Sequence, residues 1–340
     1  MKTSFRFLVL MLVIASAMVF TGCKDKQAAT PKFDILTEYL VAQDLDLPTI
    51  MTYMDGSTAI KFAAFPASDA DVPTFFAKYH VIDIRATADF AIGHISGAVN
   101  KPADSNGSYA AVLTEAANAG VKPILVVCYS GQTACFVTSL LRLYGYPKTQ
   151  ALKWGMSGWN AQFDKWTSKI GNIAQGHANW TTAAAPANVA FAAPVINAIA
   201  DEGEALLKER VEEVIAAGFK TVTGTEVLTT PSNYQINNYF STTDYAAFGH
   251  INGAFRISPL TLDGDEILFL DPAKKIVTYC YTGQTSAIIS AYLRVLGYDA
   301  YTLMWGMNGL YNSSTGWDTA ENLPNKWTAS KAKSFAVVTK

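Results

Sequence analysis

The sequence predicts an α/β protein made of two tandem copies of one domain, each a mainly parallel sheet flanked by helices. Three observations predict it. The same motifs occur twice in one order, short apolar runs end at a repeated cysteine, and a helix-like stretch follows each cysteine loop. The chain has 340 residues, which suggests about two domains at ~150 residues each. Hydrophobic residues make up 50% of it, so a sizeable core can form.

The N-terminal segment is expected to be a targeting signal rather than part of the fold. A positively charged start precedes an apolar stretch at residues 7–20, which is short for a membrane span but typical of a signal-peptide core. Residues 21–23 (TGC) then resemble the lipobox of bacterial lipoproteins, with Cys23 as the lipidation site. An ordinary secretory signal with a chance cysteine is the alternative. We expect a signal peptide at 1–22 and a polar tether at 23–32.

This resemblance implies a cell-envelope protein, in the periplasm or on the outer membrane. The lipid would then be its only contact with a membrane.

The rest of the chain is a duplication. Residues 128–133 (CYSGQT) recur 152 positions later as residues 280–285 (CYTGQT), with five of the six positions identical. Three further pairs of segments occur in the same order in both halves. Residues 93–98 (GHISGA) match 249–254 (GHINGA), residues 154–158 (WGMSG) match 305–309 (WGMNG), and residues 180–181 match 327–328 (both WT). Since so many ordered matches do not arise by chance, we expect a first domain at 33–182, a linker at 183–194 and a second domain at 195–340.

The elements follow from apolar patterns and from glycines that end helices. Buried strands are expected at residues 81–84, 123–127 and 275–279. Helices are expected at residues 134–144, 202–217 and 286–296, each followed by a glycine. Arg142 and Arg294 lie two turns into their helices and are expected at the surface or as caps. A cysteine at the carboxyl end of a strand stands where open α/β sheets place their chemistry.

Charge and cysteine content exclude several functions. The formal net charge is −2, from 26 basic and 28 acidic residues, so no basic excess is available to neutralise nucleic-acid phosphates. No two cysteines have the paired spacing of a structural zinc site, and the four histidines are scattered. We therefore expect no nucleic-acid partner, no metal and no other cofactor.

The repeated loop contains the parts that activate a cysteine without a histidine. A thiol reacts as its thiolate, so its free pKa of about 8.5 must fall. The backbone amides of a tight loop and the first turn of a helix can stabilise the anion. Gly131 and Gly283 permit the sharp turn, and Thr133 and Thr285 can offer a hydroxyl or cap the helix. We expect this arrangement to lower the pKa of both repeated cysteines.

Residues 81–85 (VIDIR), residues 93–98, the cysteine loop and residues 152–159, in this order, resemble the rhodanese (sulfurtransferase) domain. The likeness extends over essentially both halves. It implies that Cys128 and Cys280 accept a sulfane sulfur as a persulfide and pass it on. The loop residues that would surround the persulfide are Tyr129, Ser130, Gly131, Gln132 and Thr133 in the first half, and Tyr281, Thr282, Gly283, Gln284 and Thr285 in the second.

The resemblance implies small sulfur donors and thiol or cyanide-like acceptors as partners. The alternatives are a non-catalytic module that uses the rhodanese fold to bind sulfur or proteins, and a redox-sensing thiol protein. A phosphatase is disfavoured because neither loop carries the arginine that a phosphate dianion needs. The loops are neutral apart from the thiol, which favours polysulfide or a small persulfide over dianionic thiosulfate.

One acidic and one basic residue of the first half have neutral counterparts in the second. Asp83 and Arg85 are expected to form an internal ion pair that supports the first site, whereas Asn238 and Phe240 stand in their places in the second half. If the pair braces the loop, Cys128 should react faster than its counterpart.

Other residues near the motifs have structural and functional interpretations. His94 and His250 are expected to bond backbone near the loops. Cys135, on the following helix, is expected to be a core residue, with a resolving thiol as the alternative. Trp154 and Trp305 are expected to be packing residues, with a pocket wall as the alternative.

Overall fold

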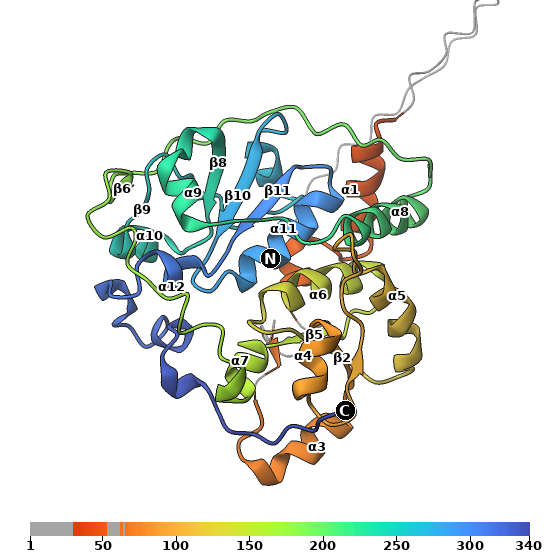
Figure 1. Ribbon diagram of the computed structural model, residues 1–340. Coiled ribbons are helices and arrows are strands. Elements are labelled where there is room, and N and C mark those ends of the chain that lie inside the picture. Colours follow the sequence, from red (N-terminus) through yellow and green to blue (C-terminus); the bar gives the residue numbers. More distant parts are fainter. Residues whose placement is uncertain (1–29, 53–61, 64) are drawn as a thin grey trace, which may run out of the picture. The chain divides into compact units, whose positions relative to one another are not determined.

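A computed structural model describes residues 30–52, 62–63 and 65–340 of the chain (Figure 1). The expected signal peptide and Cys23 lie outside the described residues. Within the described ranges, no helix combines the length and the apolar character needed to cross a membrane.

The first half contains a five-stranded sheet with the strand order β1-β5-β4-β2-β3, and all its pairings are parallel. Its strands are β1 (Phe62–Ala63), β2 (His80–Asp83), β3 (Val99–Asn100), β4 (Ile124–Val127) and β5 (Gln150–Leu152). Its helices are α1 (Lys32–Ala42), α2 (Leu47–Met51), α3 (Val72–Ala77), α4 (Thr87–Ile92), α5 (Ala110–Ala116), α6 (Gln132–Tyr144) and α7 (Gly155–Trp159).

The second half repeats this plan with a four-stranded parallel sheet in the order β7-β11-β10-β8. Its strands are β7 (Thr221–Val222), β8 (Tyr234–Asn238), β10 (Lys275–Tyr279) and β11 (Ala300–Leu303). Its helices are α8 (Gly203–Ala216), α9 (Gly224–Thr229), α10 (Thr242–Phe248), α11 (Gln284–Val295) and α12 (Gly306–Leu310). A small antiparallel pair joins β6 (Trp180–Thr181) to β9 (His250–Ile251). The predicted α/β class with parallel sheets flanked by helices is confirmed.

The strand that leads to each cysteine lies inside its sheet and is buried on both faces. In β4, Ile124 and Val126 pack into the core between the two sheets, whereas Leu125 and Val127 pack into a separate core on the outer face. Because successive side chains of a strand point to opposite faces, only a continuous apolar run satisfies both cores.

The helices that follow the cysteine loops lie side by side between the sheets (Figure 1). The Ser139 hydroxyl on α6 donates a hydrogen bond to the Ile288 carbonyl oxygen on α11 at 3.1 Å. Both helices begin two residues earlier than the apolar pattern predicts, at Gln132 and Gln284, because the left-handed glycine before each of them turns the chain directly into the helix. One apolar core therefore joins the two halves through α6 and α11.

Arg142 and Arg294 are buried rather than at the surface. The Arg142 guanidinium donates to the carbonyl oxygens of Thr149 at 2.8 Å and of Ile50 at 2.6 Å, and Arg294 donates to the carbonyl oxygen of Gly218. Buried carbonyls at the ends of neighbouring segments need donors, and a long guanidinium reaches several of them at once.

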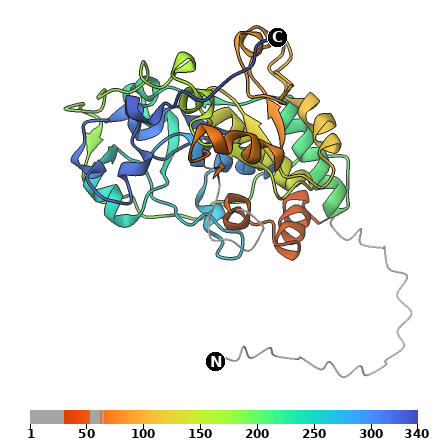
Figure 2. The same cartoon turned by 90° about the horizontal axis from the view of Figure 1, so that it is seen from below.

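Each half contributes a segment that packs on the other. Residues 171–174 leave the first half and bond to the backbone of residues 308–312 in the second. The C-terminal residues 334–338 return to the first half, where Val338 pairs with His94 in an antiparallel bridge (Figures 1 and 2). The sequence assigns these last residues to the second domain, but they complete the core of the first.

Candidate functional site

Both repeated cysteines stand at the carboxyl end of a central strand. Cys128 follows β4 and Cys280 follows β10, and both side chains are buried. Each loop turns at a glycine with a left-handed backbone, φ +83° at Gly131 and φ +73° at Gly283, and then enters the first turn of a helix. The strand, loop and helix thus place each thiol over a helix N-terminus.

The first loop directs backbone amides at the thiol. The N–H groups of Gly131 and Ala134 donate to the Cys128 sulfur at 3.1 and 3.3 Å. Both donors belong to the turn and the beginning of α6, where helix amides lack partners within the helix. The arrangement is a cradle that can stabilise negative charge on sulfur.

The second loop keeps one amide contact to its sulfur and adds a side-chain hydroxyl. The Ser286 N–H donates to the Cys280 sulfur at 3.4 Å, and the Ser286 hydroxyl lies 3.8 Å from the same sulfur. Ala134 occupies this position in the first half, so the hydroxyl is peculiar to the second. Sequence comparison of the halves could have identified Ser286, because it is the first difference after the shared motif.

The pKa of Cys128 differs from the expectation. Burial raises the pKa of the Cys128 thiol above its ordinary value, and the negative charge of Asp83 adds to the rise. Backbone hydrogen bonds from Ala134, Ser130 and Gly131 act in the opposite direction. Removal of the thiolate from water is the largest influence, so the net shift is upward and the expected lowering is wrong for this cysteine.

The repeated WGM motif supports the loops from behind. The Met156 and Ser157 amides on α7 donate to the carbonyl oxygens of Cys128 and Tyr129 at 2.8 and 2.9 Å. In the second half, Met307 and Asn308 make the same bonds to Cys280 and Tyr281 at 3.0 and 3.2 Å. A Cβ at Gly155 would overlap the Cys128 carbonyl oxygen, which explains the glycine in the motif.

The rhodanese-like domain family model matches two regions, residues 72–162 and 239–313, each containing one cysteine loop. The thiosulfate sulfurtransferase GlpE of Tolumonas auensis is 30% identical over 77 residues, which are 23% of this chain and 68% of the relative. The chain belongs to the rhodanese-like family. It is a tandem member, with one domain in each half.

Two sulfurtransferases are among the solved structures that the chain matches. The 3-mercaptopyruvate sulfurtransferase from Leishmania major shares 14% identity, with 75% of each chain covered and a TM-score of 0.29. The thiosulfate sulfurtransferase from Pseudomonas aeruginosa shares 12% identity, covering 86% of this chain and 68% of that one, with a TM-score of 0.24.

The first rhodanese-like half contains a buried ion pair behind its loop. The Arg85 guanidinium donates to both Asp83 carboxylate oxygens, at 2.7 Å for the Nη2–Oδ2 contact, and to the Gly93 carbonyl oxygen at 2.8 Å. The same guanidinium lies 5.2 Å from the centre of the Tyr129 ring. The pair therefore braces the residue that directly follows Cys128.

The second rhodanese-like half fills the same space with neutral side chains. The Phe240 ring, in place of arginine, stacks on the Tyr281 ring at 4.4 Å. Asn238, in place of aspartate, donates to the Tyr279 hydroxyl at 2.8 Å. The Tyr281 hydroxyl donates to Asp244 at 2.6 Å, and burial together with this carboxylate raises the pKa of Tyr281.

Two pairs of polar loop side chains bond to one another. The Gln132 amide donates to the Ser130 hydroxyl at 3.1 Å, and the Thr282 hydroxyl donates to the Gln284 side-chain oxygen at 3.3 Å. Thr133, like Thr285, is half-buried in the first turn of its helix. Backbone amides, rather than these side chains, donate hydrogen bonds to the Cys128 sulfur.

The two histidines stack on the aromatic residue of the preceding helix. His94 lies 3.6 Å from the Phe90 ring centre and bonds to the Phe90 carbonyl oxygen at 2.9 Å. His250 stacks on Tyr245 at 3.7 Å, and burial lowers its pKa. Cys135 is fully buried on α6.

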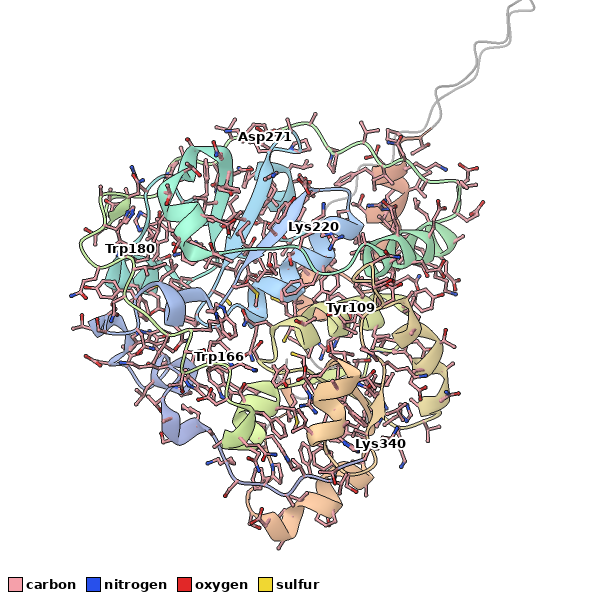
Figure 3. The ribbon with its side chains drawn as sticks, viewed as in Figure 1. Tyr109, Trp166, Trp180, Lys220, Asp271 and Lys340 are labelled. Carbon is pink, nitrogen blue, oxygen red and sulfur yellow. The ribbon has the colours of Figure 1, made fainter. Side chains whose placement is uncertain are left out.

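Sequence reasoning missed several residues near the first loop. Trp166, labelled in Figure 3, donates from its indole nitrogen to the Ser130 carbonyl oxygen at 3.2 Å and packs with Trp154, Trp305 and Trp327. The motif tryptophans are thus members of an aromatic cluster behind the loops.

Two further side chains belong to the first site. Burial raises the pKa of Tyr109 to about 12, and the nearby Cys128 charge adds to this rise. The exposed Lys165 ammonium lies 5.1 Å from the centre of the Tyr129 ring. Neither Tyr109 nor Lys165 lies in a repeated motif, so internal comparison gives no signal for them.

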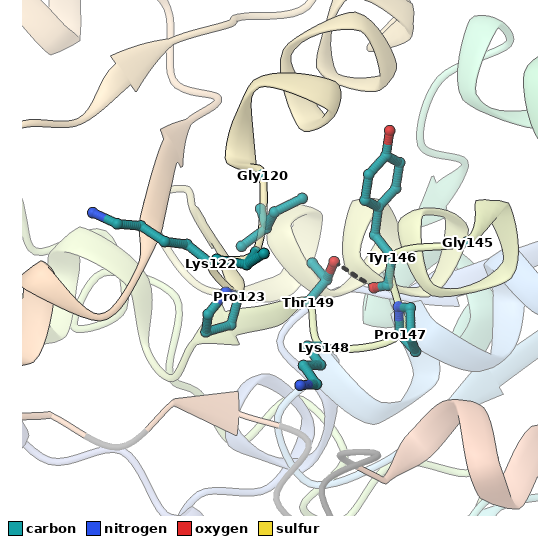
Figure 4. Close-up of a pocket in the computed structure, with 10 residues that line it drawn as sticks. Gly120, Lys122, Pro123, Gly145, Tyr146, Pro147, Lys148 and Thr149 are labelled. Atoms are coloured by element: carbon teal, nitrogen blue, oxygen red, sulfur yellow. Dashed lines mark hydrogen bonds between the residues drawn. The ribbon is translucent and has the colours of Figure 1, made fainter.

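A surface pocket of the first half lies at the other edge of its sheet (Figure 4). Its lining includes Pro123 and Thr149, which directly precede β4 and β5. Because the strands are parallel, this is the amino edge, whereas Cys128 stands at the carboxyl edge. The pocket is therefore separate from the thiol chemistry.

Proposed function

We propose that this rhodanese-like protein is a sulfurtransferase that moves a sulfane sulfur through a persulfide on Cys128, on Cys280 or on both. The observation that carries the proposal is the pair of backbone amides, from Gly131 and Ala134, directed at the Cys128 sulfur. Amides in such a cradle can stabilise the negative charge of the thiolate that attacks the donor and leaves in the second step.

The reaction has two displacements. The cysteine thiolate attacks the outer sulfur of a donor such as thiosulfate, a cysteine–sulfur bond forms, and sulfite leaves with the electron pair of the broken sulfur–sulfur bond. A thiolate or cyanide acceptor then attacks the terminal sulfur of the persulfide, and the cysteine thiolate leaves. No external oxidant or reductant is consumed, and covalent catalysis divides one transfer into two easier ones.

Intact-protein mass spectrometry after incubation with thiosulfate or polysulfide tests this proposal. Each loaded cysteine adds the mass of one sulfur atom, so the spectrum counts the working sites. Cys128→Ser combined with Cys280→Ser should abolish loading, and Cys135→Ala should preserve most of it. Full loading of the double variant would contradict the assignment, and an unloaded unmodified chain would favour a non-catalytic rhodanese-like module.

For the donor, we propose polysulfide or a small persulfide in preference to thiosulfate. Arg85 is already paired with Asp83, and Lys165 is exposed, so neither offers an unpaired buried cation to a dianion. Absence of a charge-assisted hydrogen bond costs about 1.5–3 kcal/mol, which corresponds to a roughly tenfold to hundredfold lower kcat/KM. Comparing kcat/KM for the two donors tests this, and a clear preference for thiosulfate would overturn it.

We also propose that Cys23 carries a lipid after removal of residues 1–22, which would place the enzyme in the cell envelope. The apolar run at residues 7–20, followed directly by Thr21, Gly22 and Cys23, supports this proposal. Metabolic labelling with a fatty acid should mark the natural chain and not Cys23→Ala. An unlabelled natural chain that is free in the periplasm would contradict the lipid anchor.

A further inference from the structure

Gln132 and Gln284 occupy the same position in the two loops, and each reaches across to the other half. Both side chains are fully buried. Gln284 donates from Nε2 to the Ser130 carbonyl oxygen at 3.0 Å. Gln132 accepts at Oε1 from the Trp305 backbone N–H at 2.8 Å. Gln284 thus bonds to the first cysteine loop, and Gln132 bonds to the residue that precedes α12 in the second half.

The contact made by Gln284 falls on a particular peptide group. The carbonyl oxygen of the Ser130–Gly131 peptide accepts from Gln284 and from the Trp166 indole, at 3.0 and 3.2 Å. The N–H of that same peptide donates to the Cys128 sulfur at 3.1 Å. One planar group therefore connects a side chain of the second half to the thiol of the first.

We propose that Gln284 is a positioning residue for Cys128, so that the second half sets the reactivity of the thiol in the first. Hydrogen bonds to a carbonyl polarise the amide and strengthen the bond that its N–H donates. They also fix the peptide plane, which keeps the N–H aimed at sulfur. The inference deepens the proposed sulfur transfer and adds that the two sites are not independent.

The glycine of the loop fits this arrangement. A Cβ on Gly131 would overlap the Gln284 side-chain amide, and a Cβ on Gly283 would overlap the side-chain oxygen of Gln132. The repeated glycine therefore leaves room for the opposite glutamine, besides permitting the left-handed turn.

The reverse contact acts on a different group. Trp305 precedes α12, whose Met307 amide holds the Cys280 carbonyl oxygen at 3.0 Å. Gln132 thus bonds to the support of the second loop rather than to a peptide that donates to the Cys280 sulfur. We expect the influence of Gln284 on Cys128 to exceed that of Gln132 on Cys280.

The test is the pH dependence of alkylation at Cys128 in the full chain, followed by peptide mass spectrometry so that each cysteine is read separately. Gln284→Met keeps the shape of the side chain and removes the donor. A weaker N–H bond to the thiolate should reduce the thiolate fraction of Cys128 about two- to tenfold at a given pH, which raises the alkylation midpoint by roughly 0.3–1 pH unit. Trp166→Phe removes the second donor to the same carbonyl and should raise the midpoint as well.

The matched control is Gln235→Met. Gln235 is a buried glutamine of the same half that bonds to the backbone of Phe269 and Asp271 at the amino end of β8. This substitution should leave the Cys128 midpoint unchanged, even where it lowers the free energy of unfolding. Near-ultraviolet circular dichroism checks that each variant is folded. If Gln284→Met does not fold, Trp166→Phe provides the test instead.

Alkylation needs no sulfur donor, so its result is separate from that of sulfur loading. An unchanged Cys128 midpoint in folded Gln284→Met, or in Trp166→Phe when Gln284→Met does not fold, would overturn the coupling. An equal shift in Gln235→Met would also overturn it, because the effect would then be general loosening. A shifted midpoint in a chain that loads no sulfur would support the coupling and contradict the transferase proposal.

Discussion

At the scale of single residues, the two halves use different side chains to pack the tyrosine that follows each cysteine. Arg85 lies over the Tyr129 ring and neutralises Asp83, whereas Phe240 stacks on Tyr281 beside a neutral asparagine. Loss of the arginine without loss of the aspartate would leave a buried, unpaired carboxylate. The two positions therefore have to change together.

This argument predicts the effect of Arg85→Met on the free energy of unfolding. The variant should lose about 3–5 kcal/mol, because removing one partner of a buried pair leaves the other charge uncompensated. The double variant Asp83→Asn with Arg85→Phe carries the residue types of the second half and should recover most of the loss. Urea unfolding of the three chains measures this, and a double variant as unstable as the single one would contradict the explanation.

The raised pKa of Cys128 predicts its pH dependence. The thiolate is the reactive form, and its fraction below the pKa grows about tenfold for each pH unit. Because burial raises the pKa of Cys128 above the ordinary value, alkylation should still be accelerating at pH 8.5 and should level off only above pH 9. Rates measured with iodoacetamide from pH 6 to 10 test this. A plateau below pH 8 would mean that the loop amides outweigh burial.

At the scale of elements, the cysteine loop depends on a backbone that only glycine adopts easily there. Gly131→Ala would place a left-handed alanine against Gln284, whereas Gly97 has nearly the same φ, +80° against +83°, and no atom near its missing Cβ. Both substitutions carry the backbone strain of about 1–2 kcal/mol. Only the first adds a steric overlap at the cradle.

We therefore expect Gly131→Ala to lose sulfur loading at Cys128 and Gly97→Ala to keep it. Both variants should show a reduced free energy of unfolding, with the larger reduction in Gly131→Ala. Loading by mass spectrometry and urea unfolding provide the two readouts. Equal loading of Cys128 in the two variants would contradict a role for the overlap with Gln284.

Local patterns predicted most of the elements near the site. The strand predicted at 275–279 is β10 as observed, and that at 123–127 differs from β4 by its first residue, a proline that has no N–H for the sheet. The long-range contacts could not be predicted in this way. Gln284 reaches Ser130 only because α6 packs on α11. The pKa of Cys128 is raised by burial, which no sequence motif encodes.

At the scale of the molecule, each half is completed by chain from the other. The Phe335 ring packs at 4.6 Å from the Trp159 ring centre, and the Trp159 indole donates to the Ala336 carbonyl oxygen at 3.0 Å. Trp159 ends α7, whose amides hold the carbonyls of the first cysteine loop. The C-terminal segment thus lies behind the first thiol, although it follows the second domain in sequence.

Phe335→Ala should therefore weaken the first site from the far end of the chain. Removal of a buried phenylalanine costs about 3–5 kcal/mol of unfolding free energy, and Phe335 is 6% exposed. Val338→Ala, at a side chain that is 41% exposed, should cost no more than about 0.5 kcal/mol and serves as the control. Hydrogen exchange should show faster amide exchange in α7 and in the Cys128 loop for Phe335→Ala, while the Cys280 loop keeps its protection. Faster exchange confined to the second half would contradict this account, because the C-terminal segment would then stabilise the domain that precedes it and not the one on which it packs.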